Sequence, residues 1–287
     1  MRARMILRYA IPVAILSVIL VRVGVKPFVD AVRDTDAASL ALATAVTALT
    51  TVFAAWRWQT VAAGLGVRIP LGPAVLSYYR SQFLNLTLPF GVMGDVHRGV
   101  IHGRTNGGVA LGLRAVAWER FCGQVVATAL TLGVLSAVSW SGRPVVAVGM
   151  GTAAVVGIAL VLALAPGSRR TILIASALAT LGHVVVFLIA VRMTAPELSL
   201  LPMLPIGLVV LVAAAVPLNL AGWGPREGAA AYIFVVAGHT AAQGVAVSAA
   251  FGVLALGAAL PGAVVVLLSR SEVESPKAEP ILEAADA

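Results

Sequence analysis

Six charged side chains lie inside or directly beside apolar stretches of this chain, and they have the clearest potential for chemistry. A charge without a partner costs roughly 2.5–3.5 kcal/mol at the centre of a lipid bilayer. Residues of this kind therefore pair with one another, line water or lie near an interface. The set holds three acids and three bases, so mutual pairing is feasible: Asp95, Arg98, Glu119, Arg120, Arg226 and Glu227.

The three arginines predict a binding site for a phosphate. A planar guanidinium donates two parallel hydrogen bonds, which matches the geometry of phosphate oxygens. We expect Arg98 and Arg226 to hold the phosphate of a lipid head group, with Arg120 as a further donor. The three acids would orient the arginines, hold a cationic head group or carry a proton. The alternative is an ion-pair network with a purely structural role.

Glycine, proline and asparagine residues surround these charges in two segments. Glycine adopts backbone angles that other residues resist, and asparagine can cap the broken end of a helix. Free backbone N–H groups at such breaks would add anion-binding capacity. We expect eight residues to form the backbone and caps of the pocket, with tight packing as the equal alternative for the glycines: Asn85, Pro89, Gly91, Gly94, Pro217, Asn219, Gly222 and Gly224.

No metal or cofactor site is expected. His97 and His102 have no third ligand nearby, and His183 stands alone in an apolar stretch, where a packed or hydrogen-bonded histidine is the usual case. The chain contains no P-loop and no H-E-x-x-H or G-x-S-x-G motif. Its net charge of +8 lies at the flanks of apolar runs, which is unlike a nucleic-acid-binding surface. We therefore predict neither an enzyme nor a nucleic-acid-binding protein.

The composition predicts a membrane protein. Hydrophobic residues make up 60% of the chain and charged residues 11%, compared with about 45–50% and about 25% in soluble domains. A helix of roughly 20 residues crosses the hydrocarbon core. Six apolar runs approach or exceed that length: 6–23, 37–56, 109–140, 144–165, 171–192 and 245–268.

Two further apolar segments, 72–104 and 201–240, contain proline, glycine and charged residues near their middle. Irregular backbone survives at membrane depth only where protein or water surrounds it. We therefore expect each segment to form a helix–break–helix hairpin that enters and leaves the membrane on one side. The predicted fold class is all-α and membrane-integral, with about six transmembrane helices and two re-entrant helical hairpins.

The two interrupted segments align with each other. Pro89 and Arg98 each lie 128 residues before Pro217 and Arg226, and the same offset carries 109–140 onto the last apolar run. Each half then holds three spans and one hairpin, so the halves are inverted relative to each other. Paired interrupted segments in inverted halves point to a transporter-type site.

We expect one membrane domain over 1–270, with pseudo-repeats at about 5–140 and 141–270, followed by a disordered tail over 271–287. Basic residues beside the runs predict that both termini are cytoplasmic. Arg143 and Arg192 would be external, and several aromatic residues, Trp56, Trp58, Tyr78 and Tyr79, would anchor the protein at the interfaces. The charges assigned to the cytoplasmic side are Arg2, Arg4, Arg8, Arg57, Arg68, Arg80, Arg104, Arg169 and Arg170.

An ordered set of motifs carries a family resemblance. The residues are Asn85-x-x-Leu88-Pro89-x-Gly91-x-x-Gly94-Asp95-x-x-Arg98, then Glu119-Arg120, then Pro217-x-Asn219-x-x-Gly222-x-Gly224-x-Arg226-Glu227. Over roughly 5–270 the chain resembles the lysylphosphatidylglycerol synthase transmembrane region family, also known as flippase-like domain proteins.

The resemblance implies a protein of the cell membrane that moves a lipid, or a lipid-linked head group, between leaflets. The expected partner is a membrane lipid that is anionic or linked to polyprenyl phosphate, together with a possible partner synthase or glycosyltransferase. Some family members fuse this region to a soluble aminoacyl-transferase, and only a short segment follows residue 270 here. We therefore expect no synthase activity. Two alternatives stay open: an enzyme acting on a lipid-linked substrate, and an accessory scaffold of a lipid synthase or glycosyltransferase.

Overall fold

The computed structural model describes residues 17–18, 20–88, 91–105, 107–139, 142–216 and 223–274. The first predicted span, 6–23, and the basic residues at the N-terminus lie almost entirely outside this part. Residues 17–18 and 20–23 are helical, and ten further helices follow them. They are α2 (Lys26–Arg33), α3 (Ala37–Gly64), α4 (Leu71–Thr87), α5 (Met93–Thr105), α6 (Val109–Ser139), α7 (Pro144–Leu164), α8 (Arg169–Thr194), α9 (Leu200–Ala214), α10 (Pro225–Val236) and α11 (Ala241–Glu274).

Five helices in the described part are long and apolar enough to cross a membrane: α3, α6, α7, α8 and α11. Each corresponds to one of the predicted apolar runs. Because a helix satisfies its own backbone polar groups, it is the form in which such runs can cross hydrocarbon. The prediction of an all-helical, multi-pass membrane protein is confirmed.

Both interrupted segments are broken helices, as predicted. The first is α4 and α5, joined across 88–92, and the second is α9 and α10, joined across 215–224. Glycine has a specific role at each break, because Gly91 has φ +59° and Gly224 has φ +120°, a region that side chains other than glycine rarely adopt. Four predicted pocket residues lie outside the described part: Pro89, Pro217, Asn219 and Gly222.

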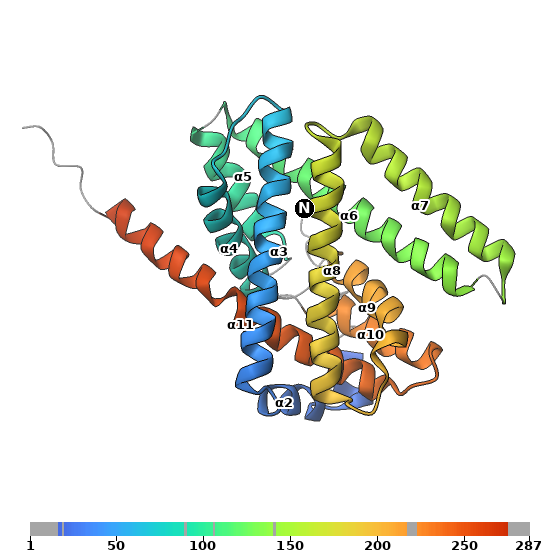
Figure 1. The fold of residues 1–287 in the computed structure, drawn as a ribbon. Coiled ribbons are helices and arrows are strands. Elements are labelled where there is room, and N and C mark those ends of the chain that lie inside the picture. The colour runs from blue at the N-terminus through green and yellow to red at the C-terminus, as the bar shows by residue number, and fades with distance from the viewer. Residues whose placement is uncertain are drawn as a thin grey trace, which may run out of the picture.

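The long helices α3 and α8 stand side by side at the centre of the molecule and run in opposite directions (Figure 1). The pair α4 and α5 lies beside one end of α3, and the pair α9 and α10 lies beside the other end of α8 (Figure 1). Each pair packs internally, and α6 and α11 cross between the two sides. The broken helices are thereby held against the central pair.

Two helices extend beyond the predicted runs. The run expected to end at residue 56 continues as α3 to Gly64, because the polar side chains that interrupt it find partners inside the protein. α11 continues to Glu274, beyond the apolar run that was expected to end at residue 268. Residues 275–287 lie outside the described part.

The helices of the first half approach one another closely at glycines. A Cβ atom added at Gly94 would collide with the backbone carbonyl of Ser81, and one added at Gly112 would collide with that of Gly99. α5 therefore packs directly against the backbones of α4 and α6. This packing fixes the distance between the charged residues that these three helices carry.

Candidate functional site

Glu119 of α6 is the centre of a buried ion-pair network. The residue is 0% exposed. Its Oε1 accepts hydrogen bonds from Arg57 Nε at 2.8 Å and Tyr78 Oη at 2.7 Å, and Arg57 Nη2 also pairs with it. Its Oε2 accepts from Arg98 Nη2 at 3.0 Å. One carboxylate thus joins α3, α4, α5 and α6.

Asp95, in the first turn of α5, is the second carboxylate of the network. Arg98 Nη2 donates to its Oδ1 at 2.9 Å, and the Arg120 guanidinium pairs with its Oδ2. Ser81 Oγ and Asn85 Nδ2 donate to it at 3.0 Å and 2.7 Å. Asp95 therefore pairs with both Arg98 and Arg120.

Arg98 lies at the back of the site rather than at its surface. The guanidinium carbon is 4.4 Å from the ring centroid of Trp58 and 4.1 Å from that of Tyr78. A cation held over aromatic faces is stabilised by the ring quadrupole. Together with the two carboxylates, these rings surround Arg98, and the residue is 1% exposed.

Arg226 and Glu227 form a separate pair at the start of α10. Arg226 Nε donates to Glu227 Oε1 at 2.8 Å and to Ser248 Oγ at 3.1 Å. Glu227 Oε2 accepts from the backbone N–H of Gly224 at 2.6 Å, which caps the helix. The guanidinium lies 5.2 Å from the ring centroid of Trp223 and directly over Gly252 of α11.

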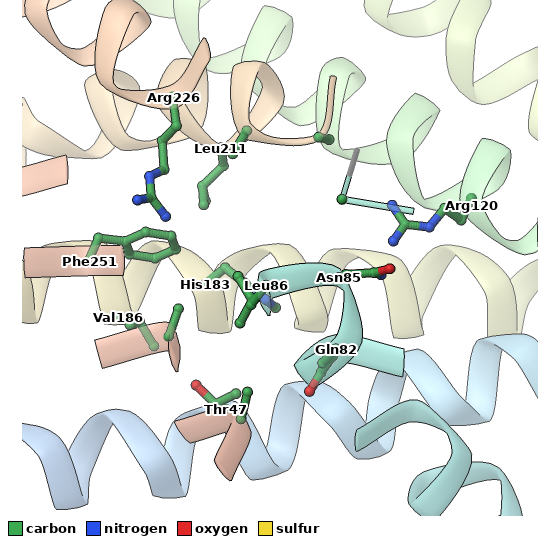
Figure 2. A pocket seen from close by; sticks show the side chains of 15 residues that line it. Thr47, Gln82, Asn85, Leu86, Arg120, His183, Val186, Leu211, Arg226 and Phe251 are labelled. Atoms are coloured by element: carbon green, nitrogen blue, oxygen red, sulfur yellow. The ribbon is translucent and has the colours of Figure 1, made fainter. Parts of the chain in front are cut away.

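The two groups of charges meet at a cavity of about 290 Å³ (Figure 2). Arg120 and Arg226 approach it from two sides, and Asn85 and His183 lie between them (Figure 2). The side chain of Arg120 is 41% exposed, although it is paired with Asp95. The remaining wall is polar near α4 and apolar near α9 and α11: Thr47, Gln82, Leu86, Gly91, Val186, Leu211, Ala214, Ala215, Phe251, Ala255 and Ala259.

A second, mainly apolar cavity of about 420 Å³ adjoins the first across α11. Leu86 and Arg226 belong to the walls of both cavities. Phe251 and Ala255 face the first cavity, whereas Gly252 and Leu256 face the second, so the two cavities lie against adjacent faces of one helix. A molecule bound to Arg226 would therefore have apolar space within reach.

The two groups together hold one more base than acids. Arg57, Arg98, Arg120 and Arg226 face only three carboxylates, those of Asp95, Glu119 and Glu227. Burying an uncompensated charge is unfavourable unless it reaches water or an opposite charge. An anion in the cavity would balance this excess.

The predicted site residues fall into two groups, those that line the cavity and those that lie behind it. Arg120, Arg226, Asn85 and Gly91 line the cavity, while the three acids and Arg98 stand behind it and hold the lining residues. Asn85 has the predicted capping role, because its Oδ1 accepts the N–H of Gly94 at 2.8 Å. Of the two arginines predicted to form one clamp, Arg226 lines the cavity and Arg98 does not, although both are buried, at 5% and 1% exposed.

Three residues of the network lie in positions other than those expected from the sequence. Arg57 was predicted to be a charge at the cytoplasmic end of a span, but it is buried and paired with Glu119. Trp58 and Tyr78 were predicted to be interface anchors, and both are buried against Arg98. The signal that could have found Arg57 is the apolar sequence on both sides of it, since 60–64 continues the helix.

A comparison against protein families gives a match over the first part of the chain. The sequence model of the lysylphosphatidylglycerol synthase TM region matches residues 5–173, which is more than half of the chain. The chain belongs to this family. The match includes the first broken-helix motif and Glu119-Arg120 of this synthase TM region, whereas the second motif, around Arg226, lies beyond it. A search of curated proteins found no match to the chain.

Proposed function

We propose that this member of the lysylphosphatidylglycerol synthase TM region family moves an anionic lipid, or a lipid-linked head group, between the leaflets of a membrane. The observation that carries the proposal is the cavity into which Arg120 and Arg226 both face, with no acidic residue among its described lining residues. The arginines hold the phosphate, because each fork can donate two hydrogen bonds to it. Asp95, Glu119, Glu227 and Arg98 fix the positions of these two arginines.

The adjoining apolar cavity supports an amphiphile as the ligand. A phosphate held at Arg226 leaves the attached hydrocarbon chain beside Leu86 and Leu256, in the space between α2, α4 and α11. Burial of such a chain contributes roughly 0.8 kcal/mol per CH₂ group. The phosphate supplies orientation and the chain supplies affinity, as in other ligand sites with few polar groups.

Movement between leaflets is proposed to follow from an inverted repeat. In this repeat α3, α4, α5 and α6 correspond in order to α8, α9, α10 and α11, at the offset of 128 residues seen in the sequence. The packing partners correspond as well: α6 contacts α3, α5, α8 and α9, and α11 contacts α8, α10, α3 and α4. Rocking of two such halves around re-entrant hairpins would expose the cavity first to one leaflet and then to the other.

The lipid is proposed to come from a synthase or a glycosyltransferase, and the chain itself is proposed to have no enzymatic step. A direct test compares the wild type with Arg120→Gln/Arg226→Gln, each purified in mild detergent, by mass spectrometry of the bound lipids. We expect one anionic lipid class to be enriched with the wild type and lost from the variant. Arg143→Gln, which changes an exposed arginine between α6 and α7, is the matched control.

The same lipid is then tested for translocation in vesicles that contain the protein. Translocation by the wild type and by Arg143→Gln, with loss in the double variant, is the expected result. If the folded double variant keeps the same lipids as the wild type and moves them equally fast, the cavity is not a head-group site. The charges would then act only in holding the helices together, as in the scaffold alternative.

A further inference from the structure

His183 is the one imidazole in the wall of the cavity between Arg120 and Arg226. It lies near the middle of α8, at the level of Leu86 in the close view (Figure 2). Its Nδ1 is 2.7 Å from the backbone carbonyl oxygen of Ala179, one turn earlier in the same helix. The ring is therefore fixed by its own helix, and neither of the ion-pair groups uses it.

The contact with Ala179 determines the state of both ring nitrogens. A carbonyl oxygen only accepts hydrogen bonds, so Nδ1 must carry a proton. In a neutral imidazole Nε2 then has a lone pair and accepts a hydrogen bond. Within the described part of the chain no hydrogen bond reaches Nε2, although the ring forms part of the cavity wall.

The charges around His183 favour the neutral ring while the cavity is empty. The helices packed against α8 are α3, α6, α9 and α11. α3 presents Arg57 and α6 presents Arg120, while α10 brings Arg226 to the opposite wall. The described side chains of α9 and α11 carry no charge, and the acids Asp95, Glu119 and Glu227 are all engaged by arginines. A further positive charge among these arginines is unfavourable.

We propose that His183 takes up a proton at Nε2 when a phosphate enters the cavity, so that head-group binding is coupled to the uptake of one proton. The anion offsets the positive charge of the arginines, and Nε2–H then donates a hydrogen bond to a phosphate oxygen. The proton comes from water, and no other bond forms or breaks. This inference rests on the proposed function, because it requires a phosphate between Arg120 and Arg226.

The coupling has a definite sign. The imidazole binds a proton more readily in the complex than in the empty protein, so the affinity for an anionic lipid is higher at low pH and falls as the pH rises. For one proton the change is at most about tenfold per pH unit. A phosphodiester keeps its single charge throughout this range, so a pH dependence of its binding originates in the protein.

The test titrates a short-chain phosphatidylglycerol into the detergent-solubilised full chain by isothermal titration calorimetry, from about pH 5.5 to about pH 8.5. Repeating each titration in two buffers with different heats of ionisation measures the protons taken up. For the wild type we expect affinity to fall with rising pH and a fraction of one proton to be absorbed. His183→Gln, which keeps a polar side chain without a titrating group, should bind with an affinity independent of pH and without uptake.

His239→Gln is the matched control, because His239 lies after the end of α10 and outside the cavity wall; it should behave like the wild type. His183→Asn replaces the glutamine variant if that variant does not fold. A wild type with no proton uptake, or a His183 variant with the wild-type pH dependence, would overturn the inference alone. Absence of saturable binding in the wild type would overturn the inference together with the proposed head-group site.

Discussion

Glu119 is the residue on which the charges of the first half converge. Its two oxygens bind Arg57, Tyr78 and Arg98, which come from three different helices. Because both buried arginines donate hydrogen bonds to this one carboxylate, its negative charge offsets the cost of burying their positive charges. The same residue sets the position of Arg98, on which Asp95 and therefore Arg120 depend.

Replacing Glu119 by glutamine should destabilise the protein strongly. The change keeps the shape of the side chain but leaves Arg57 and Arg98 with too little negative charge. Removing one partner of a buried ion pair typically costs about 3–5 kcal/mol. Thermal unfolding in detergent, followed by circular dichroism, measures the effect as a lower Tm.

Glu197→Gln is the control for this prediction, because Glu197 is exposed between α8 and α9. It should change the Tm very little, since surface pairs contribute about 0–1 kcal/mol. Equal melting temperatures for Glu119→Gln, Glu197→Gln and the wild type would contradict the assignment of Glu119 as the centre of the network.

At the scale of elements, the broken helix α4–α5 depends on close backbone contact. The cap from Asn85 to the N–H of Gly94 joins the end of α4 to the first turn of α5. Directly beside it, Gly94 allows α5 to rest on the carbonyl of Ser81. Asp95 follows at once, so the spacing of the two helices decides where this carboxylate lies.

Gly94→Ala should therefore separate α4 from α5. The new methyl group meets backbone atoms that cannot rotate away, and overpacking of this kind typically costs about 1–3 kcal/mol. We expect a lower Tm and weaker retention of the anionic lipid, because Asp95 and Arg120 shift together.

Gly149→Ala in α7 provides the comparison, since a Cβ atom there has no neighbour within 4 Å. Alanine is favoured over glycine in a helix interior by roughly 0.5–1 kcal/mol, so this variant should be as stable as the wild type or more stable. A loss of stability as large as that of Gly94→Ala would refute the argument from close approach.

For the whole molecule, the antiparallel pair α3 and α8 defines two ends. The connection from α3 to α4 lies beside the connection from α7 to α8, because Gly64 and Gly167 are in contact. The other ends of the pair carry the connection before α3 and the connection after α8. In a membrane these two ends face opposite sides.

Labelling of introduced cysteines tests this orientation. In a Cys122→Ala background, we expect Arg68→Cys and Ser168→Cys to react from the cytoplasmic side, and Asp34→Cys and Glu197→Cys from the outside. All four positions are exposed, whereas Cys122 is buried. An impermeant thiol reagent applied to intact cells and to inverted vesicles measures the sidedness, and reaction of all four from one side would exclude α3 and α8 as spanning helices.

The sequence by itself determined the membrane class, five of the long helices and the two breaks. These features are local: the length and composition of each run, and the glycines and prolines within a segment, decide them through backbone hydrogen bonding in an apolar solvent. The family could also be recognised, because its motifs are short and contiguous. The end of α3 was missed, because partners elsewhere in the protein extend this helix beyond residue 56.

Only the tertiary structure decided which charges pair and which face the cavity. Arg57 is 62 residues from Glu119 in sequence, and its guanidinium also reaches Ser176, 119 residues away. Arg98 and Arg226 are equivalent in the sequence pattern, and both are buried over aromatic rings, yet of the two it is Arg226 that lines the cavity. That difference arises from packing between distant helices, which determines how much of each guanidinium is left for a ligand.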